Sequence, residues 1–409
     1  MITVLRDARI FDGVSAELTE GATVVVEGDR IREITTAHRS FADARVIECR
    51  GHFLMPGLID AHFHAYTPTF DMSKIDRMPQ ALLVSHARVI LEGALQRGFT
   101  TVRDAGGGDI GLWMAIEEGW IQGPRFFFSG KAISQTGGHG DARPGTVVEP
   151  CGCSRYTGVL SLVADGVDEV RRAVREELRK GARQIKIFVS GGVVSPTDPL
   201  WMPQFTDEEI RAAVHEASTR RTYVMAHCLT DDGARRCVES GVRSIEHGTQ
   251  ISEDTAHLIA SKKAFVVPTL SVVDVLRKHA ADLGLSPMSR QKIAGVYESY
   301  AKSIEACTRA GVKIGLGSDL LGQEFHRLQG GELALRAEFN RPIDVLRSAT
   351  SVNAELLQMS DQLGCIQPDA YADLLVTKGD PLKDLGLFRE PLTNVLLIMK
   401  GGVCIRSAL

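Results

Sequence analysis

A repeated alternation of short apolar strands and amphipathic helices between residues 54 and 319 constrains this chain most. Eight segments predict buried strands, because each is a short apolar run bounded by turn residues. Stretches such as 167–181 and 206–221 lie between them with helical periodicity, the second with Thr206 as its expected N-cap. This alternation predicts an α/β protein with a parallel sheet. The strand candidates are residues 54–64, 100–107, 125–134, 184–192, 222–228, 243–248, 264–270 and 312–319.

Eight such units predict a (β/α)8 TIM barrel, a fold of about 250 residues or more. A doubly wound open sheet is the alternative, but no GxGxxG segment follows any strand to support it. Both ends of the 409-residue chain instead alternate apolar and polar residues between turn dipeptides. We therefore expect a small β-sandwich domain built from both termini, residues 1–56 and 362–409, with the barrel at 57–361 inserted through it.

Composition limits the partners and the compartment. The net charge is −4, without a basic stripe for nucleic acid or an anionic membrane, and no window approaches the ~18 apolar residues of a membrane span. Arg6, Asp7 and Arg9 stand where a signal peptide needs an apolar core. Of the eight cysteines only Cys151 and Cys153 are close together, so reduced structural thiols are favoured over a cysteine metal site. These features predict a cytoplasmic protein with a small-molecule substrate and no nucleic-acid or membrane partner.

Titratable side chains gather at the C-terminal ends of the predicted strands, where barrel enzymes build their active sites. His62 and His64 are two residues apart and share one face of a strand, so both can bind one metal ion. Each residue has a simpler interpretation: a lone strand histidine is more often a hydrogen-bonded core residue, and Asp319 could cap a turn. Six such residues at matching strand ends favour a site instead. The six are His62, His64, Lys186, His227, His247 and Asp319.

The order HxH, Lys, His, His, Asp resembles the amidohydrolase superfamily, in particular its binuclear, carboxylated-lysine branch. The resemblance covers nearly the whole chain. Segments similar to those of its prolidase-like (Xaa-Pro and Xaa-amino acid) dipeptidase group are "MPGLIDAHFH", "GFTTVRDAGG", "SQTGGHGD", "QIKIFVSGG", "SIEHGT" and "PDAYADLLV".

The resemblance implies two divalent metal ions. His62, His64 and Asp319 would hold the more buried ion, and His227 and His247 the more exposed one. Lys186 would react with carbon dioxide to give a carbamate that bridges both ions, which also removes the problem of a buried ammonium. Nitrogen and carboxylate ligands suit zinc, with manganese and cobalt as alternatives.

The resemblance also implies a mechanism. A metal-bridging hydroxide would attack the substrate carbonyl, with Asp319 shuttling the proton to the leaving nitrogen. His139, in "SQTGGHGD", is similar to the family histidine that stabilises the oxyanion. The simpler interpretation of His139 is a loop histidine that faces water.

The substrate residues depart from the family pattern at one position. Leu229 stands two residues after the strand-5 histidine, where dipeptidases of this group often have Tyr or His, so a hydrogen-bond donor is replaced by apolar surface. Arg143 is a candidate cation for a substrate carboxylate. Gly192 and Val193, in "SGGV", are expected where the backbone approaches a small substrate.

We therefore expect a metal-dependent amidohydrolase that cleaves an amide C–N bond. A prolidase-like dipeptidase or an N-acyl amino acid hydrolase is favoured, acting as a homo-oligomer. Non-peptide amides, ureas, carbamates or lactams are the alternative substrates. A mononuclear deaminase is disfavoured, because that branch lacks the strand-4 lysine. The alternative from another class is a non-catalytic scaffold of the same fold, although scaffolds usually lose ligands that this chain keeps.

Overall fold

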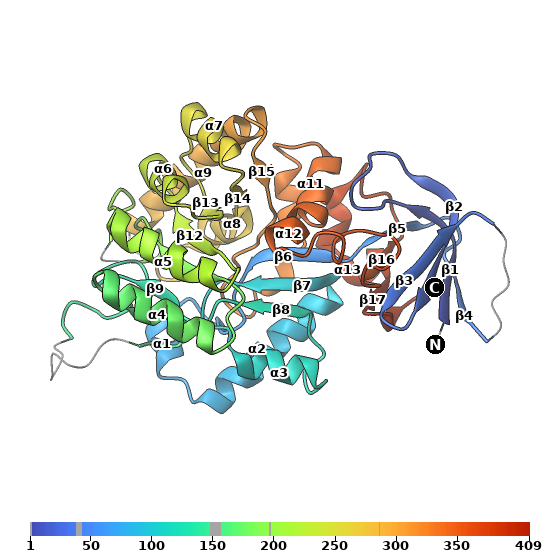
Figure 1. The fold of residues 1–409 in the computed structure, drawn as a ribbon, viewed down its shortest axis with the longest axis horizontal. Helices are drawn as coiled ribbons and strands as arrows, with labels where there is room; N and C mark the ends of the chain where they lie inside the picture. Colours follow the sequence, from blue (N-terminus) through green and yellow to red (C-terminus); the bar gives the residue numbers. More distant parts are fainter. Residues whose placement is uncertain (1, 38–42, 148–156, 196–197, 286) are drawn as a thin grey trace.

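The computed structural model describes residues 2–37, 43–147, 157–195, 198–285 and 287–409 (Figure 1). Cys151 and Cys153, for which reduced structural thiols are predicted, lie outside the described residues. The six cysteines within them are free thiols. None of the helices in these ranges combines the length and apolar character that a membrane crossing needs.

The central part of the chain is the predicted (β/α)8 barrel. Neighbouring barrel strands pair in parallel, and the gap between the third and fourth is bridged by the Arg183 amide, which donates to the Phe128 carbonyl. The barrel closes where the amides of Ala61 and Asp319 donate to the carbonyls of Leu316 and His62, both at 2.8 Å. The barrel strands are β6 (Leu58–Phe63), β7 (Phe99–Asp104), β8 (Arg125–Phe128), β11 (Ile185–Phe188), β12 (Val224–Cys228), β13 (Ser244–His247), β14 (Phe265–Val267) and β15 (Lys313–Ile314).

One predicted strand is divided in the structure. Residues 125–134 form β8 and a separate strand, β9 (Ala132–Ser134), which pairs with β10 (Ser161–Val163) and β11. The break falls at Gly130, whose φ of 68° is incompatible with a strand. A Cβ at this position would also collide with the carboxylate of Glu177, so the chain needs glycine at the turn.

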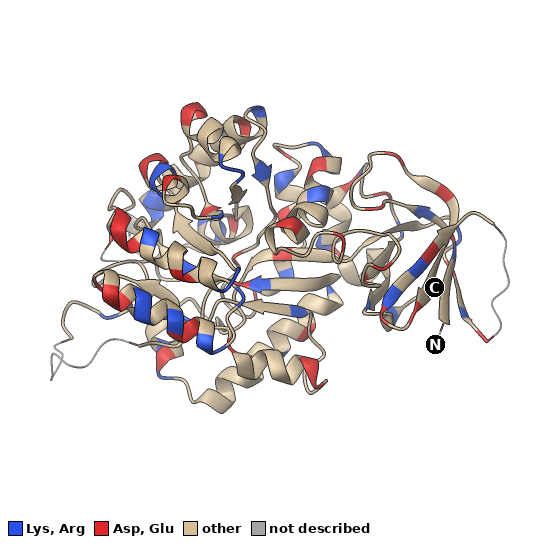
Figure 2. Ribbon diagram, viewed as in Figure 1, with Lys and Arg blue, Asp and Glu red and all other residues tan. Residues whose placement is uncertain are grey.

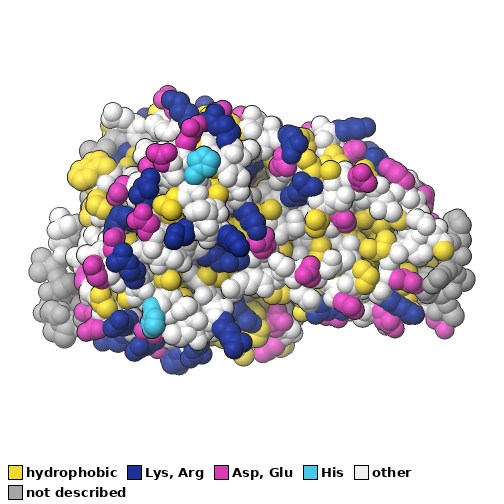
Figure 3. All heavy atoms as spheres, turned by 45° about the horizontal axis from the view of Figure 1, so that its top comes forward, with side chains coloured by type: hydrophobic (Ala, Val, Ile, Leu, Met, Phe, Trp, Pro, Cys, Tyr) yellow, Lys and Arg dark blue, Asp and Glu magenta, His cyan; other side chains and the backbone are white. Residues whose placement is uncertain are grey.

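Helices surround the barrel. Many of the Lys, Arg, Asp and Glu residues of this part of the chain lie on these helices (Figure 2). Thr206 caps α5 as predicted, in a capping box with Glu209. Figure 3 shows side chains of both charges interspersed over the visible barrel face. The helices are α1 (Met72–Asp76), α2 (Gln80–Gln96), α3 (Ile110–Glu117), α4 (Val167–Arg179), α5 (Asp207–Thr219), α6 (Asp231–Glu239), α7 (Glu253–Ser261), α8 (Leu270–His279), α9 (Pro287–Arg309), α10 (Gly331–Arg336), α11 (Pro342–Ser348), α12 (Ser351–Leu356) and α13 (Pro391–Asn394), with 3-10 turns at His326–Leu328 and Leu385–Arg389.

The two termini together build a second sheet, as the sequence predicts (Figure 1). Strand β5 joins the N-terminal and C-terminal strands of this sheet, because it pairs in parallel with β1 and antiparallel with β16. The sheet has its own hydrophobic core, to which both halves contribute. Its described strands are β1 (Ile2–Ile10), β2 (Thr19–Glu27), β3 (Arg30–Thr35), β4 (Arg45–Glu48), β5 (Phe53–Pro56), β16 (Leu374–Thr377), β17 (Val395–Lys400) and β18 (Val403–Ser407). We propose that this unit is the domain 1–56 and 362–409.

The terminal sheet adjoins the N-terminal ends of the barrel strands. Gly57 alone separates β5 from β6, and its amide donates to the Asp373 carbonyl. Arg125, which begins β8, donates to the Asp373 carboxylate at 2.9 and 3.1 Å. The ring of Tyr371 contacts two guanidinium groups, with Arg30 3.6 Å and Arg125 3.9 Å from its centroid. Barrel and terminal sheet are therefore joined by covalent, ionic and cation–π contacts.

Candidate metal and amide-binding site

The structure brings together the six residues singled out at the strand ends. Four of them lie within barrel strands: His62 in β6, Lys186 in β11, His227 in β12 and His247 in β13. His64 directly follows β6, and Asp319 lies in the segment that follows β15. All six line one cavity of about 430 Å³ at the C-terminal end of the barrel. The barrel therefore gathers residues 257 positions apart in the chain (62 to 319) around one small volume.

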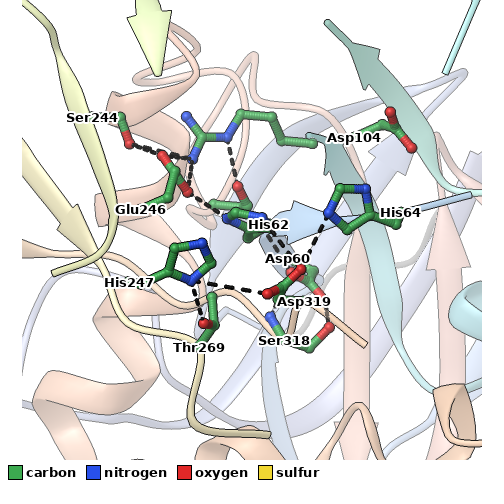
Figure 4. A network of polar contacts seen from close by, with 12 residues as sticks. Asp60, His62, His64, Asp104, Ser244, Glu246, His247, Thr269, Ser318 and Asp319 are labelled. Carbon is green, nitrogen blue, oxygen red and sulfur yellow. Dashed lines mark hydrogen bonds and ion pairs between the residues drawn. The ribbon is translucent and has the colours of Figure 1, made fainter. Parts of the chain in front are cut away.

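Asp319 lies at the centre of the first group of ligands (Figure 4). Its Oδ1 is 3.1 Å from His64 Nε2 and 3.4 Å from His62 Nε2. One candidate ligand atom from each of His62, His64 and Asp319 lies within 4.8 Å of the others. Two imidazoles and a carboxylate at this spacing can hold a divalent ion.

The second group adjoins the first. The ring centroids of His62 and His247 are 5.0 Å apart, and those of His227 and His247 are 4.6 Å apart. Lys186 is buried, and its Nζ lies 5.6 Å from the Phe188 ring centroid. A lysine therefore shares a small enclosed volume with imidazoles and a carboxylate.

The backbone is strained at two of these residues. His247 and Asp319 have φ values of 72° and 52°, in the left-handed region that residues other than glycine seldom adopt. Such conformations cost about 1–3 kcal/mol each and persist only where surrounding contacts enforce them. Two candidate ligands are therefore held in conformations that their surroundings must enforce, although the chain has other left-handed residues outside the site.

Hydrogen bonds to one nitrogen of three histidines indicate which nitrogen remains for a metal. His62 Nδ1 is 2.7 Å from Glu246 Oε2, and His247 Nδ1 is 2.7 Å from Thr269 Oγ1. His227 instead places Nε2 3.4 Å from the Gly191 carbonyl oxygen. A nitrogen that donates a hydrogen bond carries the proton, so the opposite nitrogen is the ligand. Nε2 of His62 and Nδ1 of His227 are thus left to coordinate, because their partners can only accept. Where Nδ1 of His247 is the donor to Thr269, its Nε2 is left as well.

A buried ionic network supports His62. Glu246 receives hydrogen bonds from Arg103 Nη2 at 2.9 and 3.0 Å, from Ser244 Oγ at 2.5 Å and from His62. Arg103 also donates to the Ala61 carbonyl, and both charged side chains are fully buried. Because every oxygen of this carboxylate is used, the network holds the His62 ring in one orientation.

Burial favours the neutral form of three of the imidazoles, which is the form that binds a metal. It lowers the pKa of His62 and His227, and lowers that of His247 to about 4. Burial also lowers the pKa of Lys186 to about 8, against the opposing charges of Glu246 and Asp319. Burial acts to raise the pKa of Asp319, but the surrounding histidines outweigh it and lower that pKa. These groups can therefore be ligands near neutral pH.

His139 lies beside the two groups of ligands. Its ring stacks on that of His227, with centroids 4.4 Å apart, and its Nδ1 is 3.1 Å from Asp198 Oδ2. Its amide donates to Gln204 Oε1, whose own amide group donates to Asp198. Gly192 packs against the ring so closely that a Cβ there would overlap it. The predicted loop residues Gly192 and His139 are thus in contact and backed by Asp198.

The remaining predicted substrate residues line the cavity. Leu229 and Val193 are buried in its wall, and Leu229 is fixed on both sides: its amide donates to Ser190 Oγ, and its carbonyl accepts from Thr249 Oγ1. Arg143 also reaches the cavity, but its guanidinium donates to the Asp141 carboxylate at 2.7 and 2.8 Å. A substrate carboxylate would therefore meet an arginine that is already paired.

Sequence reasoning missed several residues that support the site. Glu246 and Arg103 are charged residues inside buried strands, and this signal was available in "SIEHG" and "TTVRDAGG". Asp60 and Asp104 accept backbone amides from residues near the ligands, including those of His62 and Ala65. The further residues missed, without a comparable signal, are Asp198, Thr269 and Tyr300.

Comparison with known proteins agrees with this geometry. The family described as the Amidohydrolase family matches residues 53–404. Ochratoxinase of Aspergillus niger is 34% identical over 370 residues, covering 85% of this chain and 75% of that protein.

Solved structures extend the likeness to the whole chain. A prolidase in complex with N-methylphosphonate-L-proline is 46% identical with a TM-score of 0.95, and the match covers 100% of both chains. A Xaa-Pro dipeptidase with methionine bound in its active site is 31% identical with a TM-score of 0.89, again over 100% of both. The crystal structure of the A. niger ochratoxinase is 29% identical with a TM-score of 0.86, covering 99% of this chain and 96% of that one.

Proposed function

Because the chain belongs to the amidohydrolase family and is a hydrolase of amide or peptide C–N bonds, we propose that it is a prolidase-like dipeptidase or N-acyl amino acid hydrolase. The observation that carries the proposal is the placement of six titratable residues in the wall of one otherwise largely apolar cavity of about 430 Å³. A cavity of this size suits a small amide rather than a folded protein.

The proposal includes two divalent metal ions, with zinc favoured by the nitrogen and carboxylate ligands. His62, His64 and Asp319 would hold one ion and His227 and His247 the other, with Lys186 carboxylated between them. Bound ions would supply an acidified water and an electrophile for the carbonyl oxygen. The neutral imidazoles and the low pKa of Asp319 support this assignment.

The chain's own residues would do the rest. Asp319, within 3.1 Å of His64, is placed to take up a proton at its carboxylate and deliver it to the leaving nitrogen. His139 would contact the reacting carbonyl. The apolar wall around Leu229 would exclude water from the amide. A homo-oligomer stays a prediction, and the free thiols of the described part support a reducing, cytoplasmic location.

A screen tests the proposed function directly. Zinc-loaded protein should hydrolyse members of a library of dipeptides and N-acyl amino acids, and metal analysis should find two ions per chain. Turnover of ureas, carbamates or lactams instead would transfer the proposal to the alternative substrates. Protein that binds no metal and hydrolyses none of these compounds would favour the non-catalytic scaffold.

Replacing Asp319 separates proton transfer from metal binding. Asp319→Asn keeps an oxygen at the same place but removes the base, so turnover should fall by at least ~10²-fold. The variant should keep at least one metal ion, because His227 and His247 are unchanged. Steady-state kinetics with metal analysis measures both effects. Turnover within a few-fold of the unsubstituted enzyme would show that Asp319 is not the base.

Replacing Leu229 tests the specificity of the cavity. Burying a leucine-sized group stabilises by ~1.5–3 kcal/mol, so the present wall should favour substrates with a bulky apolar group near the scissile carbonyl. Leu229→Tyr should raise kcat/KM on simple dipeptides relative to apolar N-acyl substrates by roughly 10-fold, since ~1.4 kcal/mol is tenfold. Leu229→Met, which keeps an apolar side chain of similar size, should leave this ratio unchanged. An unchanged or lower ratio for Leu229→Tyr would exclude Leu229 from the substrate contact.

A further inference from the structure

Two helices, α8 and α9, form an aliphatic wall of the cavity. Val272, Val273 and Leu276 of α8 face it together with Val296 of α9. Tyr300, one helical turn after Val296, brings a phenol into this wall and is 1% exposed. A buried tyrosine hydroxyl normally finds a hydrogen-bond partner, so the partner of this hydroxyl matters.

Hydrogen bonds link Tyr300 to a candidate ligand. His247 Nδ1 lies 2.7 Å from Thr269 Oγ1, which in turn lies 3.4 Å from Tyr300 Oη. Coordination of a metal ion through Nε2 of His247 would leave the ring proton on Nδ1, which then donates to Thr269. Thr269 then has its own hydroxyl proton left to donate to Tyr300.

This direction leaves the phenol proton of Tyr300 available to the cavity. Burial raises the pKa of Tyr300, and the charges of Glu332 and Asp319 raise it further, although hydrogen bonds donated by Thr269 oppose them. The phenol therefore stays protonated throughout the neutral pH range. Leu229, in the same cavity, has no donor to offer.

We propose that Tyr300 donates a hydrogen bond from its phenol to the carbonyl oxygen of the substrate amide. It is thus a catalytic residue supplied by α9 rather than by a strand end. The assignment rests on the proposed amide hydrolysis. A donor directed at the reacting oxygen gains strength as negative charge develops there, which is the requirement for stabilising the transition state.

Tyr300→Phe removes one oxygen atom and keeps the ring packed, so the fold should be retained. Loss of one oxyanion donor predicts a fall in kcat on the order of 10²-fold, with KM changed by less than about 3-fold. Metal content and the melting temperature should match those of the unsubstituted enzyme. Tyr297→Phe is the matched control, because Tyr297 lies on the same helix under the Arg277 guanidinium and is not among the residues lining the cavity. It should leave kcat unchanged.

A binding measurement provides a readout besides turnover. Titration calorimetry with N-methylphosphonate-L-proline, a tetrahedral mimic of the reaction, should show at least ~10-fold weaker binding to Tyr300→Phe than to Tyr297→Phe. Equal binding together with equal kcat would overturn the role of Tyr300. A variant that loses metal along with activity would also overturn it, because the hydroxyl would then act through Thr269 and His247 and not on the substrate. If the unsubstituted enzyme hydrolyses no amide, the proposed function fails first, and this assignment fails with it.

Discussion

Lys186→Ala should bind far fewer than two metal ions per chain and lose measurable turnover. Lys186 is buried beside His227, His247 and Asp319, in a place where an ammonium is costly, and burial lowers its pKa to about 8. The neutral amine that this favours is the form that reacts with carbon dioxide. Loss of the resulting carbamate would remove a shared anionic ligand from both proposed ions.

Three measurements check this result. Metal analysis gives the ion content, and short carboxylic acids such as acetate should partly restore turnover by occupying the emptied position. The carbonyl signal of protein exchanged with 13C-bicarbonate should be present in the unsubstituted enzyme and absent from the variant. Lys313→Ala, which removes an exposed lysine on β15, is the control and should change none of them. Full metal content with a normal rate in Lys186→Ala would contradict the bridging role.

Deleting everything after Ser360 should make the protein insoluble. The deletion removes β16, which pairs along the whole of β5, and so exposes Leu54 and Met55, both fully buried in the intact protein. Each such side chain accounts for ~1.5–3 kcal/mol of burial. Losing several of them, together with the residues of the deleted strands, exceeds the ~5–15 kcal/mol by which a domain is stable.

Expression and sedimentation of the fragment check the expectation. A matched truncation that removes Ala408 and Leu409 alone leaves every strand intact and should stay soluble. A soluble, active fragment ending near Ser360 would contradict the proposed domain of residues 1–56 and 362–409.

The positions of the six candidate ligands could be predicted because the signal is local. His62 and His64 share a strand face, and Lys186 is a charge within an apolar run, so chain position alone indicates that they face one interior. The parallel arrangement then places all strand ends at one rim. No detail of packing is needed for that step.

The supporting residues depend on contacts that chain position does not determine. Glu246 meets His62 across the barrel, and their pairing follows from how β6 and β13 face each other in the closed sheet. Thr269 and Tyr300 depend on which face of α8 and α9 lies toward the cavity. Residues 125–134 are divided into two strands at Gly130, which has a positive φ and packs against Glu177 of α4. Each is a consequence of three-dimensional packing between distant segments.

The junction between β5 and β6 bears on how the protein loses its activity on heating. Strand β5 belongs to the terminal sheet, β6 carries His62, and only Gly57 lies between them. Opening the sheet frees β5 from β16 and withdraws Asp373 and Tyr371 from Arg125, so the same event loosens the strand that holds the first histidines. We therefore expect heat inactivation to begin as a cooperative local opening at the N-terminal end of the barrel. In that case the contacts that set the rate of inactivation lie outside the cavity, so they can be strengthened without altering any residue that lines it.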